Sequence, residues 1–400
     1  MTVLVQKFGG TSLQSEESIS KVISHIKYAV ERQYKLVVVV SALGRQPDTY
    51  ATDTLLNLVD WSVPFHNERE MDLLMSCGET IASIVLSNEL QKNHINSTAL
   101  TGGQAGIMTT AEFTQAEIKN VDTTRLEKEL NNFDVVVVAG FQGQTTDGEI
   151  TTIGRGGSDT TAAALGVALN AEKIEIFTDV NGIMTADPRI VKSARQLKRA
   201  TYSDSCNLAN QGAKVIHPSA VEIARVANVP LHVRSTYETK NGTLITDFGP
   251  EQSITGIAHK SALTHFKIEK KEHRDQIFKK LSDTGIQVDF SAISSTGLLF
   301  TIPKANTQTA IGLIKDLGCK PPQVIENCAK VSVVGNDLLS GPIASKIADE
   351  LNEKDIQILQ SADSHTTIGV LIHEMDLVRA VNLLHDTLQL SQPLESGVTN

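Results

Sequence analysis

Short runs of β-branched and aliphatic residues alternate, over the first 245 residues or so, with longer stretches whose apolar positions recur every three or four residues. The short runs predict strands and the longer stretches predict amphipathic helices. The expected strands are Val3–Phe8, Leu36–Val40, Val135–Ala139, Ile174–Phe177 and Leu231–Val233, and the expected helices are Glu16–Arg32, Met71–Lys92 and Ser158–Asn170, the last with Ser158 and Asp159 as candidate caps. This alternation predicts an α/β domain built around a mainly parallel sheet.

A second pattern begins after a short polar segment that contains Gly249 and Pro250. Comparing the remaining chain with itself at a shift of 70 residues (351 − 281) reveals an ungapped duplication. The aligned pairs include Leu281 with Leu351, Gln287 with Gln357, Ser291 with Ser361, Ala292 with Ala362, Ile302 with Ile372 and Ala310 with Ala380. Each copy follows a leading strand, Thr264–Ile268 or Lys330–Val334, and predicts a ferredoxin-like βαββαβ unit. Duplication alone leaves open whether these units bind a ligand or only pack.

Composition excludes several classes of protein. A chain of 400 residues is too long for one ordinary core, so two or three domains are expected. The net charge of −10, without a long Lys/Arg run, argues against nucleic acid and anionic membranes as partners. The four cysteines form no CxxC pair, no apolar run is long enough to span a bilayer, and the first residues lack the pattern of a secretory signal. We therefore expect a cytoplasmic protein.

Three polar clusters follow predicted strands, namely residues 7–12, 154–161 and 178–189. In an open parallel sheet, ligands bind beyond the carboxyl ends of the strands. Glycines in the first two clusters allow backbone N–H groups to approach an anion, and Lys7 adds a point charge. Arg155 offers a planar fork that matches a carboxylate, and Asp159 can orient a lysine. Each cluster alone could be a tight turn or a capped helix, but together they predict a binding site for anionic substrates.

The stretches KFGGTS (7–12), GRGGSDTTA (154–162) and TDVNGIMTADPR (178–189), with VVSALG (39–44) and GAKVIHP (212–218), resemble the motifs of the aspartokinases, within the amino acid kinase family. The resemblance runs from Val3 to about Leu390. It implies an α/β/α sandwich kinase domain followed by two ACT domains, the second completed by a strand near Ile257 that precedes the first. The expected boundaries are 1–248 for the catalytic domain, 249–263 for the linker and this strand, 264–329 and 330–392 for the ACT domains, and 393–400 for a tail.

The resemblance implies transfer of the ATP γ-phosphoryl group to the β-carboxylate of L-aspartate, the first step of lysine, threonine, methionine and diaminopimelate biosynthesis. Because a carboxylate is already deprotonated, the reaction needs positioning and charge neutralisation rather than a general base. The implied catalytic residues are Lys7 and Asp159. The implied ATP contacts are Lys7, Gly9, Gly10, Thr178, Asp179, Met184, Arg189 and Lys214, and the implied aspartate contacts are Ser41, Thr52, Glu79, Arg155 and Ser158. Mg²⁺ would be held mainly by phosphate oxygens and water, without a dedicated protein ligand.

Some stretches depart from the family pattern. The loop after Ser41 is longer than the common form, so Thr49 competes with Thr52 for the aspartate contact, and Met184 stands where many members have tyrosine. The first ACT unit lacks an Asp-x-Pro-Gly turn at Lys270–Arg274, whereas the second keeps a comparable turn at Leu339–Pro342.

The ACT pair implies regulation and assembly. An amino-acid effector is expected near Asn336, Ser340, Ser361 and His365, and the pair is expected to form a homodimer or a higher homo-oligomer. Which effector acts, if any, stays open among lysine, threonine, methionine and diaminopimelate. Two other functions also stay open: a family enzyme acting on glutamate, carbamate or a nucleotide, and an inactive amino-acid sensor.

Overall fold

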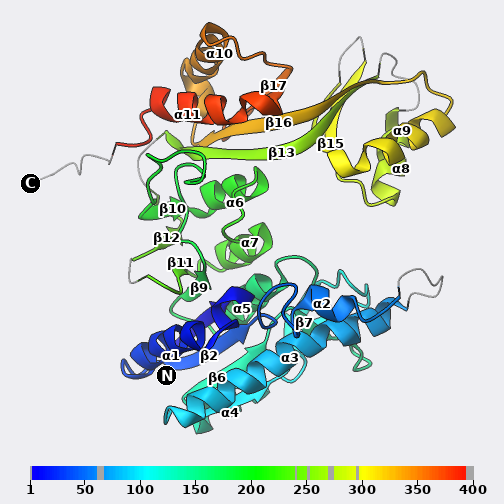
Figure 1. Cartoon of the computed structure of the whole chain (residues 1–400). Coiled ribbons are helices and arrows are strands. Elements are labelled where there is room, and N and C mark those ends of the chain that lie inside the picture. Colours follow the sequence, from blue (N-terminus) through cyan, green and yellow to red (C-terminus); the bar gives the residue numbers. More distant parts are fainter. Residues whose placement is uncertain are drawn as a thin grey trace, which may run out of the picture. The chain divides into compact units, whose positions relative to one another are not determined.

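The computed structural model describes residues 2–60, 67–238, 241–249, 253–268, 274–293 and 297–392. The chain forms two compact units (Figure 1). The first comprises Met1–Ile183, Gln196–Ala209 and Lys214–Pro250, and the second comprises Met184–Arg195, Asn210–Ala213 and Glu251–Asn400. Among the described residues, no helix is both long and apolar enough to cross a membrane.

An eight-stranded sheet forms the centre of the first unit, and only its β11–β12 pair is antiparallel. The five predicted strands are confirmed and occupy consecutive places. The valine-rich runs of β2 and β6 are buried on both faces, as is typical of a parallel sheet covered by helices. In spatial order the strands are β10 (Arg199–Thr201), β12 (Thr243–Thr246), β11 (Leu231–Ser235), β9 (Ile174–Thr178), β1 (Val3–Phe8), β2 (Lys35–Val40), β6 (Val135–Ala139) and β3 (Ser97–Leu100).

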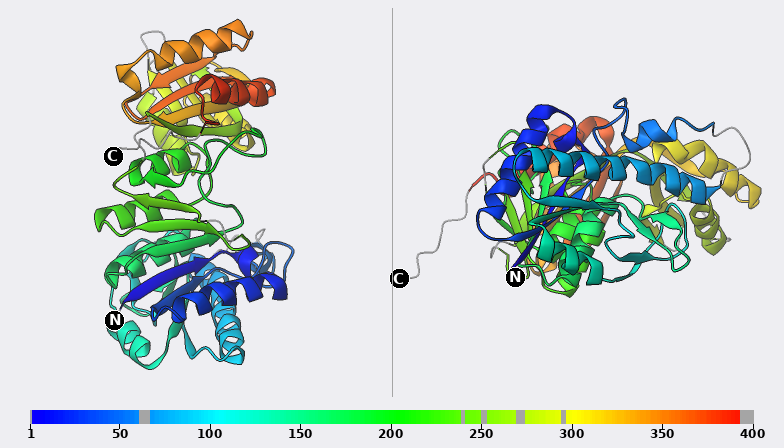
Figure 2. Two further views of the ribbon diagram at one scale, coloured as in Figure 1. Left: turned by 90° about the vertical axis from the view of Figure 1, so that its left-hand side faces the viewer. Right: turned by 90° about the horizontal axis from the view of Figure 1, so that it is seen from below.

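Helices cover both faces of this sheet (Figure 2). On one face, α1 (Glu16–Val30) and α3 (Glu68–Lys92) pack against Leu4 and Phe8 of β1. On the other face lies α5 (Gly157–Ala168), where Gly166 approaches Val5. Since side chains alternate along a strand, Gln6 lies on the α1 face and Lys7 on the α5 face. The remaining helices of this unit are α2 (Thr52–Leu56), α4 (Thr124–Asn132), α6 (Tyr202–Asn210) and α7 (Pro218–Val226).

The start of α5 differs from its prediction. Gly156 is the N-cap residue, with a left-handed backbone (φ 71°), and Ser158 and Asp159 lie inside the first turn instead of capping it. A Cβ atom at Gly156 would lie 2.1 Å from the ring of His217, so both the backbone and the space require glycine. The prediction of Ser158 or Asp159 as the cap was wrong, and Asp159 is free to turn toward β1.

The second unit contains a six-stranded antiparallel sheet. Its strand order is β14 (Asp289–Ile293), β15 (Leu298–Pro303), β13 (Ile254–Ile268), β16 (Gln323–Gly335), β18 (Thr367–His373) and β17 (Gln360–Asp363). Its helices are α8 (Arg274–Asp283), α9 (Thr307–Asp316), α10 (Ile343–Glu353) and α11 (Leu377–Thr387). The starts of α9 and α11 differ by 70 residues (377 − 307), so the sequence duplication is also a structural one.

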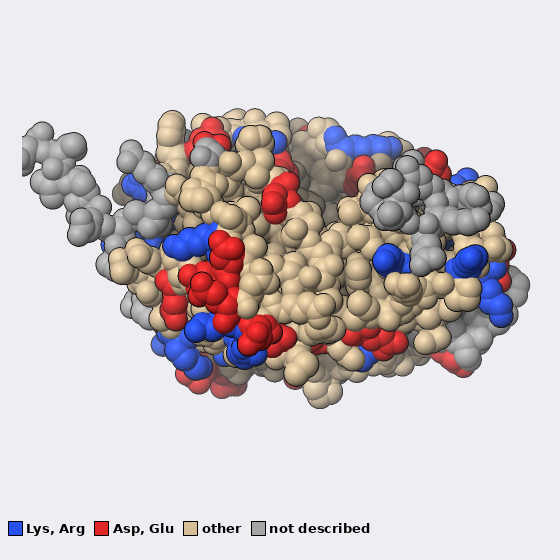
Figure 3. All heavy atoms as spheres, turned by 90° about the horizontal axis from the view of Figure 1, so that it is seen from above, with Lys and Arg blue, Asp and Glu red and all other residues tan. Residues whose placement is uncertain are grey.

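Strands β13 and β16 each serve both copies of the duplication. In the first half of β13, Ile257 pairs with Val333 of β16, and in the second half Phe266 pairs with Phe300 of β15. Each copy nevertheless has its own apolar core, one around Phe266, Leu281 and Phe300 and the other around Val331, Leu351 and Val370. On the face drawn in Figure 3, separate groups of basic and of acidic side chains lie around a broad uncharged area.

Candidate active site

The turn after β1 brings backbone and charge together. A short 3-10 helix, η1 (Gly10–Leu13), follows Gly9, and the Ser12 N–H donates to the Gly9 carbonyl at 2.9 Å. A Cβ atom at Gly10 would lie 2.5 Å from the Gly44 carbonyl oxygen, so this close approach requires glycine. The Lys7 Nζ atom lies 2.7 Å from Asp159 Oδ1, and both side chains are only 13% exposed. The pair places one cation beside this glycine turn, which spans residues 9–12.

The first turn of α5 supplies the second part of the site. The first N–H groups of a helix have no partner within the helix and attract anions. Asp159 also accepts the His217 N–H at 3.3 Å, which holds its carboxylate toward Lys7. Ser158 is buried in the same turn, while Arg155 is exposed just before it. Within the described part of the chain, no carboxylate lies within ion-pair distance of Arg155, so its guanidinium is available to an anionic ligand.

Glu79 is the most unusual group of the site. It lies on α3, is 3% exposed, and accepts the Ala42 N–H through Oε1 at 3.1 Å. Its Oε2 atom is buried and has no hydrogen-bond partner among the described residues. Burial raises the pKa of Glu79 to about 8. A buried carboxyl group with one unused oxygen can accept hydrogen bonds from a cationic ligand.

These elements surround one pocket of about 300 Å³. Its lining contains all the predicted catalytic and aspartate-binding residues, namely Lys7, Ser41, Thr52, Glu79, Arg155, Ser158 and Asp159, together with Gly10, a predicted ATP contact. Thr52, the first residue of α2, lines the pocket, whereas Thr49 is exposed and is absent from the lining. Phe141 also lines it and was not predicted; its only sequence signal is its place after β6, whose carboxyl end meets the same sheet edge.

Most of the predicted nucleotide contacts do not line this pocket. Four of them belong to the first unit, namely Gly9, Thr178, Asp179 and Lys214. Thr178 ends β9 and donates to Asp179 Oδ1 at 3.1 Å. Met184 and Arg189 belong to the second unit. There Arg189 pairs with Asp187 at 2.7 Å, and this contact lowers the pKa of Asp187.

The predicted effector residues lie in the second unit. The Leu338 N–H donates to the His365 carbonyl at 2.9 Å, which joins the turn after β16 to the turn between β17 and β18. Asn336, Ser361 and His365 are exposed, and Ser340 ends the 3-10 helix η3 (Leu338–Ser340). Of the altered turn in the first copy, residues 270–273 lie outside the described residues.

Comparison with known proteins places this geometry in a family. Residues 2–235 match the amino acid kinase family, and residues 323–386 match an ACT domain. Aspartokinase 1 of Bacillus subtilis is 50% identical over 405 residues, which cover 98% of this chain and 100% of that protein. The chain belongs to the aspartokinase family.

Solved aspartokinase structures share the fold of this aspartokinase. Escherichia coli aspartokinase III in complex with aspartate and ADP (R-state) superposes with a TM-score of 0.80 at 23% identity, covering 97% of this chain and 100% of that one. The same protein with lysine and aspartate (T-state) gives a TM-score of 0.79 at 23% identity, covering 96% and 99%. The predicted fold class is therefore confirmed: an α/β kinase domain with a mainly parallel sheet, followed by an antiparallel ACT region.

Proposed function

We propose that this aspartokinase transfers the γ-phosphoryl group of ATP to the β-carboxylate of L-aspartate, giving ADP and 4-phospho-L-aspartate. The observation that carries the proposal is the pocket, which combines a buried carboxyl group, Glu79, with the cations of Lys7 and Arg155. Aspartate carries one ammonium group and two carboxylates, so the two signs of charge in the pocket match those of the substrate. The name of Bacillus subtilis aspartokinase 1 supports the same reaction.

On the nucleotide side, Lys7 and the N–H groups of Gly9 and Gly10 neutralise charge on the transferring phosphoryl group. Asp159 holds the Lys7 ammonium at 2.7 Å, so the charge is already in place when ATP binds. The other proposed ATP contacts are Thr178, Asp179, Met184, Arg189 and Lys214. The glycine turn leaves room for close approach of phosphate oxygens, which fits a nucleotide. Magnesium, held mainly by phosphate oxygens and water, supplies further charge neutralisation when bound.

On the aspartate side, the free Oε2 atom of Glu79 accepts hydrogen bonds from the ammonium group. Arg155 binds the α-carboxylate, since its guanidinium has the planar fork that matches two carboxylate oxygens. Hydroxyl groups of Ser41, Thr52 and Ser158 complete the contacts. Because the pKa of Glu79 is about 8 in the free protein, binding of the ammonium group releases a proton near neutral pH.

An ADP-release assay with purified protein tests this proposal. ADP should form with ATP and aspartate, and not with glutamate, carbamate or UMP in place of aspartate. Turnover of one of the other acceptors would assign the chain to another amino acid kinase activity. No ADP release with any acceptor, in a protein that still binds amino acids, would indicate an inactive sensor.

We also propose that residues 264–329 and 330–392 are ACT domains that bind an amino acid from the aspartate-derived pathway and mediate homo-oligomerisation. Escherichia coli aspartokinase III has been solved with lysine in a T-state, which supports feedback regulation of this kind. The proposed site lies at Asn336, Ser340, Ser361 and His365, between two turns that the Leu338–His365 hydrogen bond joins.

Calorimetry tests the regulatory part, with lysine, threonine, methionine and diaminopimelate as ligands and Ser340→Ala as the comparison variant. Binding of one of them should change aspartate saturation, since effector and substrate affinities are linked. If none binds and sedimentation shows a dimer, the ACT pair serves assembly alone.

A further inference from the structure

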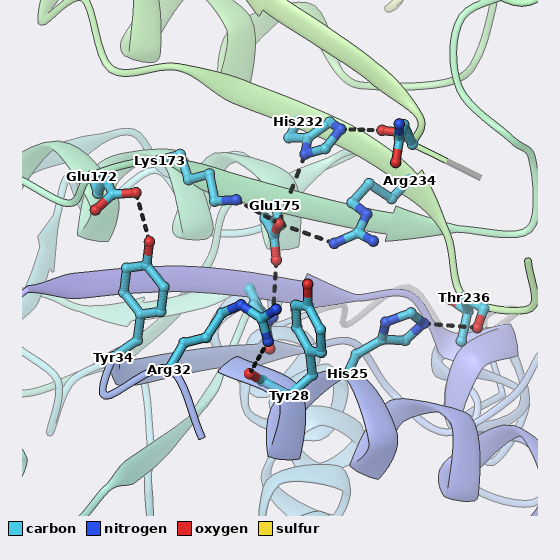
Figure 4. A network of polar contacts seen from close by, with 12 residues as sticks. His25, Tyr28, Arg32, Tyr34, Glu172, Lys173, Glu175, His232, Arg234 and Thr236 are labelled. Carbon is cyan, nitrogen blue, oxygen red and sulfur yellow. Dashed lines mark hydrogen bonds and ion pairs between the residues drawn. The ribbon is translucent and has the colours of Figure 1, made fainter. Parts of the chain in front are cut away.

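A buried charge cluster lies on the α1 face of the sheet, opposite Lys7 (Figure 4). At its centre is Glu175 of β9, 3% exposed, which accepts from Gln6 Nε2 of β1 at 2.9 Å. Arg234 of β11 lies 3.1 Å from the same carboxylate, and Lys173 also lies 3.1 Å from it. These contacts join β1, β9 and β11 across the sheet.

Thr236 follows directly after β11 and makes three hydrogen bonds to three other elements. Its Oγ1 atom lies 2.7 Å from Ser12 Oγ of the glycine turn, and both residues are at most 1% exposed. Its N–H donates to the Thr178 carbonyl at the end of β9, at 3.0 Å. Its carbonyl accepts from His25 Nε2 of α1 at 3.1 Å, a contact drawn in Figure 4. The proposed reaction does not use Thr236, yet it contacts two proposed ATP-binding segments.

The neighbouring residue strengthens the same connection. Tyr237 Oη donates to the Thr11 carbonyl at 2.7 Å, one residue before Ser12. Two side chains from the end of β11 therefore hold the glycine turn. Within the turn itself, the Ser12 N–H is bonded to the Gly9 carbonyl, so a displacement of Ser12 is transmitted to Gly9 and to its neighbour Gly10, which lines the pocket.

We propose that Thr236 is a positioning residue for the nucleotide: its hydroxyl fixes the glycine turn, through Ser12, at a constant distance from the end of β9. The inference rests on the proposed function, in which the glycine turn and Thr178 contact ATP. Binding sites lose affinity when the residues behind them stop holding the contacting groups in place. Loss of the Thr236 hydroxyl leaves Ser12 Oγ buried without this partner, which favours a displaced turn.

The test compares Thr236→Val, which keeps the side-chain shape, with Thr236→Ser, which keeps the hydroxyl. Thr236→Val should raise the ATP dissociation constant about fivefold or more, the scale of one unsatisfied buried hydroxyl. The aspartate KM should change less than about twofold, and Thr236→Ser should restore most of the ATP affinity. A double variant that combines Ser12→Ala with Thr236→Val should lose no more ATP affinity than the more affected of the two single variants. Each single substitution already removes the same hydrogen bond.

Thr264→Val is the matched control. Its hydroxyl contacts the Thr307 hydroxyl at 2.8 Å in the second unit and is equally buried. It should lower Tm about as much as Thr236→Val without changing ATP affinity. Unchanged ATP affinity in Thr236→Val, or equal losses for ATP and aspartate, would overturn the inference. Calorimetry measures ATP binding without turnover, so it tests the role of Thr236 separately from the reaction. A wild-type protein that binds ATP but releases no ADP with aspartate would contradict only the proposed reaction.

Discussion

Two buried glutamates of the first unit have opposite surroundings. Glu79 and Glu175 are each 2–3% exposed. Burial would raise the pKa of Glu175, but contacts with His232, Lys173, Gln6 and Arg234 outweigh it and hold the pKa below its usual range. Glu79 has one backbone N–H as partner and one free oxygen, and its pKa rises to about 8.

The difference separates two uses of the same side chain. A buried carboxylate whose partners are all within the protein stabilises the fold and is closed to ligands. A buried carboxyl group with incomplete partners costs stability, and this cost is offset when a ligand supplies the missing cation. Glu175 is of the first kind and Glu79 of the second, so variants of the two should have opposite effects.

The largest expected effect is on folding. Glu175→Gln should lower the free energy of unfolding by about 3 kcal/mol or more, because it leaves Lys173 and Arg234 beside a neutral group. The aspartate KM of the folded variant should stay within about twofold of the wild type. Urea denaturation and steady-state kinetics measure the two quantities. If Glu175→Gln instead raised the aspartate KM strongly without lowering stability, Glu175 would act in substrate binding, as is proposed for Glu79.

The next effect is on turnover, and it concerns Lys7. Lys7→Ala should lower kcat about 100-fold or more, the scale of losing one preorganised charge. The urea midpoint should also fall, because the largely buried Asp159 loses its ion-pair partner. Lys35→Ala is a matched control, because Lys35 also lies on a strand of the central sheet, at the start of β2, and pairs with the carboxylate of Asp134 at 2.9 Å. Its kcat should equal that of the wild type. Turnover of Lys7→Ala within about threefold of the wild type would remove Lys7 from catalysis.

Glu79→Gln should affect one substrate. A hydrogen bond to a charged partner contributes about 1.5–3 kcal/mol, so the aspartate KM should rise about 10- to 150-fold, with the ATP KM unchanged. Glu89→Gln, on the same helix and paired with Lys92 at 2.7 Å, is the control and should change neither. Equal losses for aspartate and ATP would mean that Glu79 shapes the pocket without binding the ammonium group.

The aspartate KM should also depend on pH. Only ionised Glu79 can pair with the ammonium group, and its pKa of about 8 in the free protein leaves it mostly protonated at pH 7. The aspartate KM should therefore fall as pH rises toward 8, by up to about tenfold per pH unit, and level off above it. In Glu79→Gln this dependence should vanish. An unchanged slope in the variant would assign the titration to another group.

The last expected effect is the opposite pH dependence of stability. The folded pKa of Glu79 lies above its unfolded value of 4.5, so stability falls as pH rises from 4.5 toward 8, and Glu79→Gln should remove that loss. The folded pKa of Glu175 lies below its unfolded value, so its contribution is present above pH 4.5 and is lost below it. Unfolding free energies should show that the difference between wild type and Glu79→Gln changes between pH 4.5 and 8, whereas the difference for Glu175→Gln changes below pH 4.5 and with the opposite slope.

Much of the fold was predictable from the sequence because the central strands are continuous apolar runs, as in β2 and β6, and because the duplication has no gaps. The four strands of a smaller sheet, β4 (Ile107–Thr109), β5 (Ile118–Val121), β7 (Gln142–Gln144) and β8 (Ile150–Thr152), were not predicted. Each has only three or four residues, which is too short for a periodic pattern.

The candidate site was predictable to the extent that it consists of glycine turns at strand ends. The surroundings of Glu79 were not, because its burial depends on the packing of α3 against the loop at Ala42, far away in the sequence. Thr236 was missed for the same reason: a single threonine after a strand carries no pattern, and its partners Ser12 and His25 lie more than 200 residues earlier.

The two long strands β13 and β16 determine where the second unit can be divided into fragments. The strand that completes the second copy, the first half of β13, is encoded before the first copy begins. A fragment containing residues 330–392 alone would lack this strand, and a chain truncated at 329 would leave the same strand without its partner in β16. Either cut exposes a strand edge that can recruit another chain. A fragment that keeps both copies paired should therefore run from the start of β13 to the end of α11.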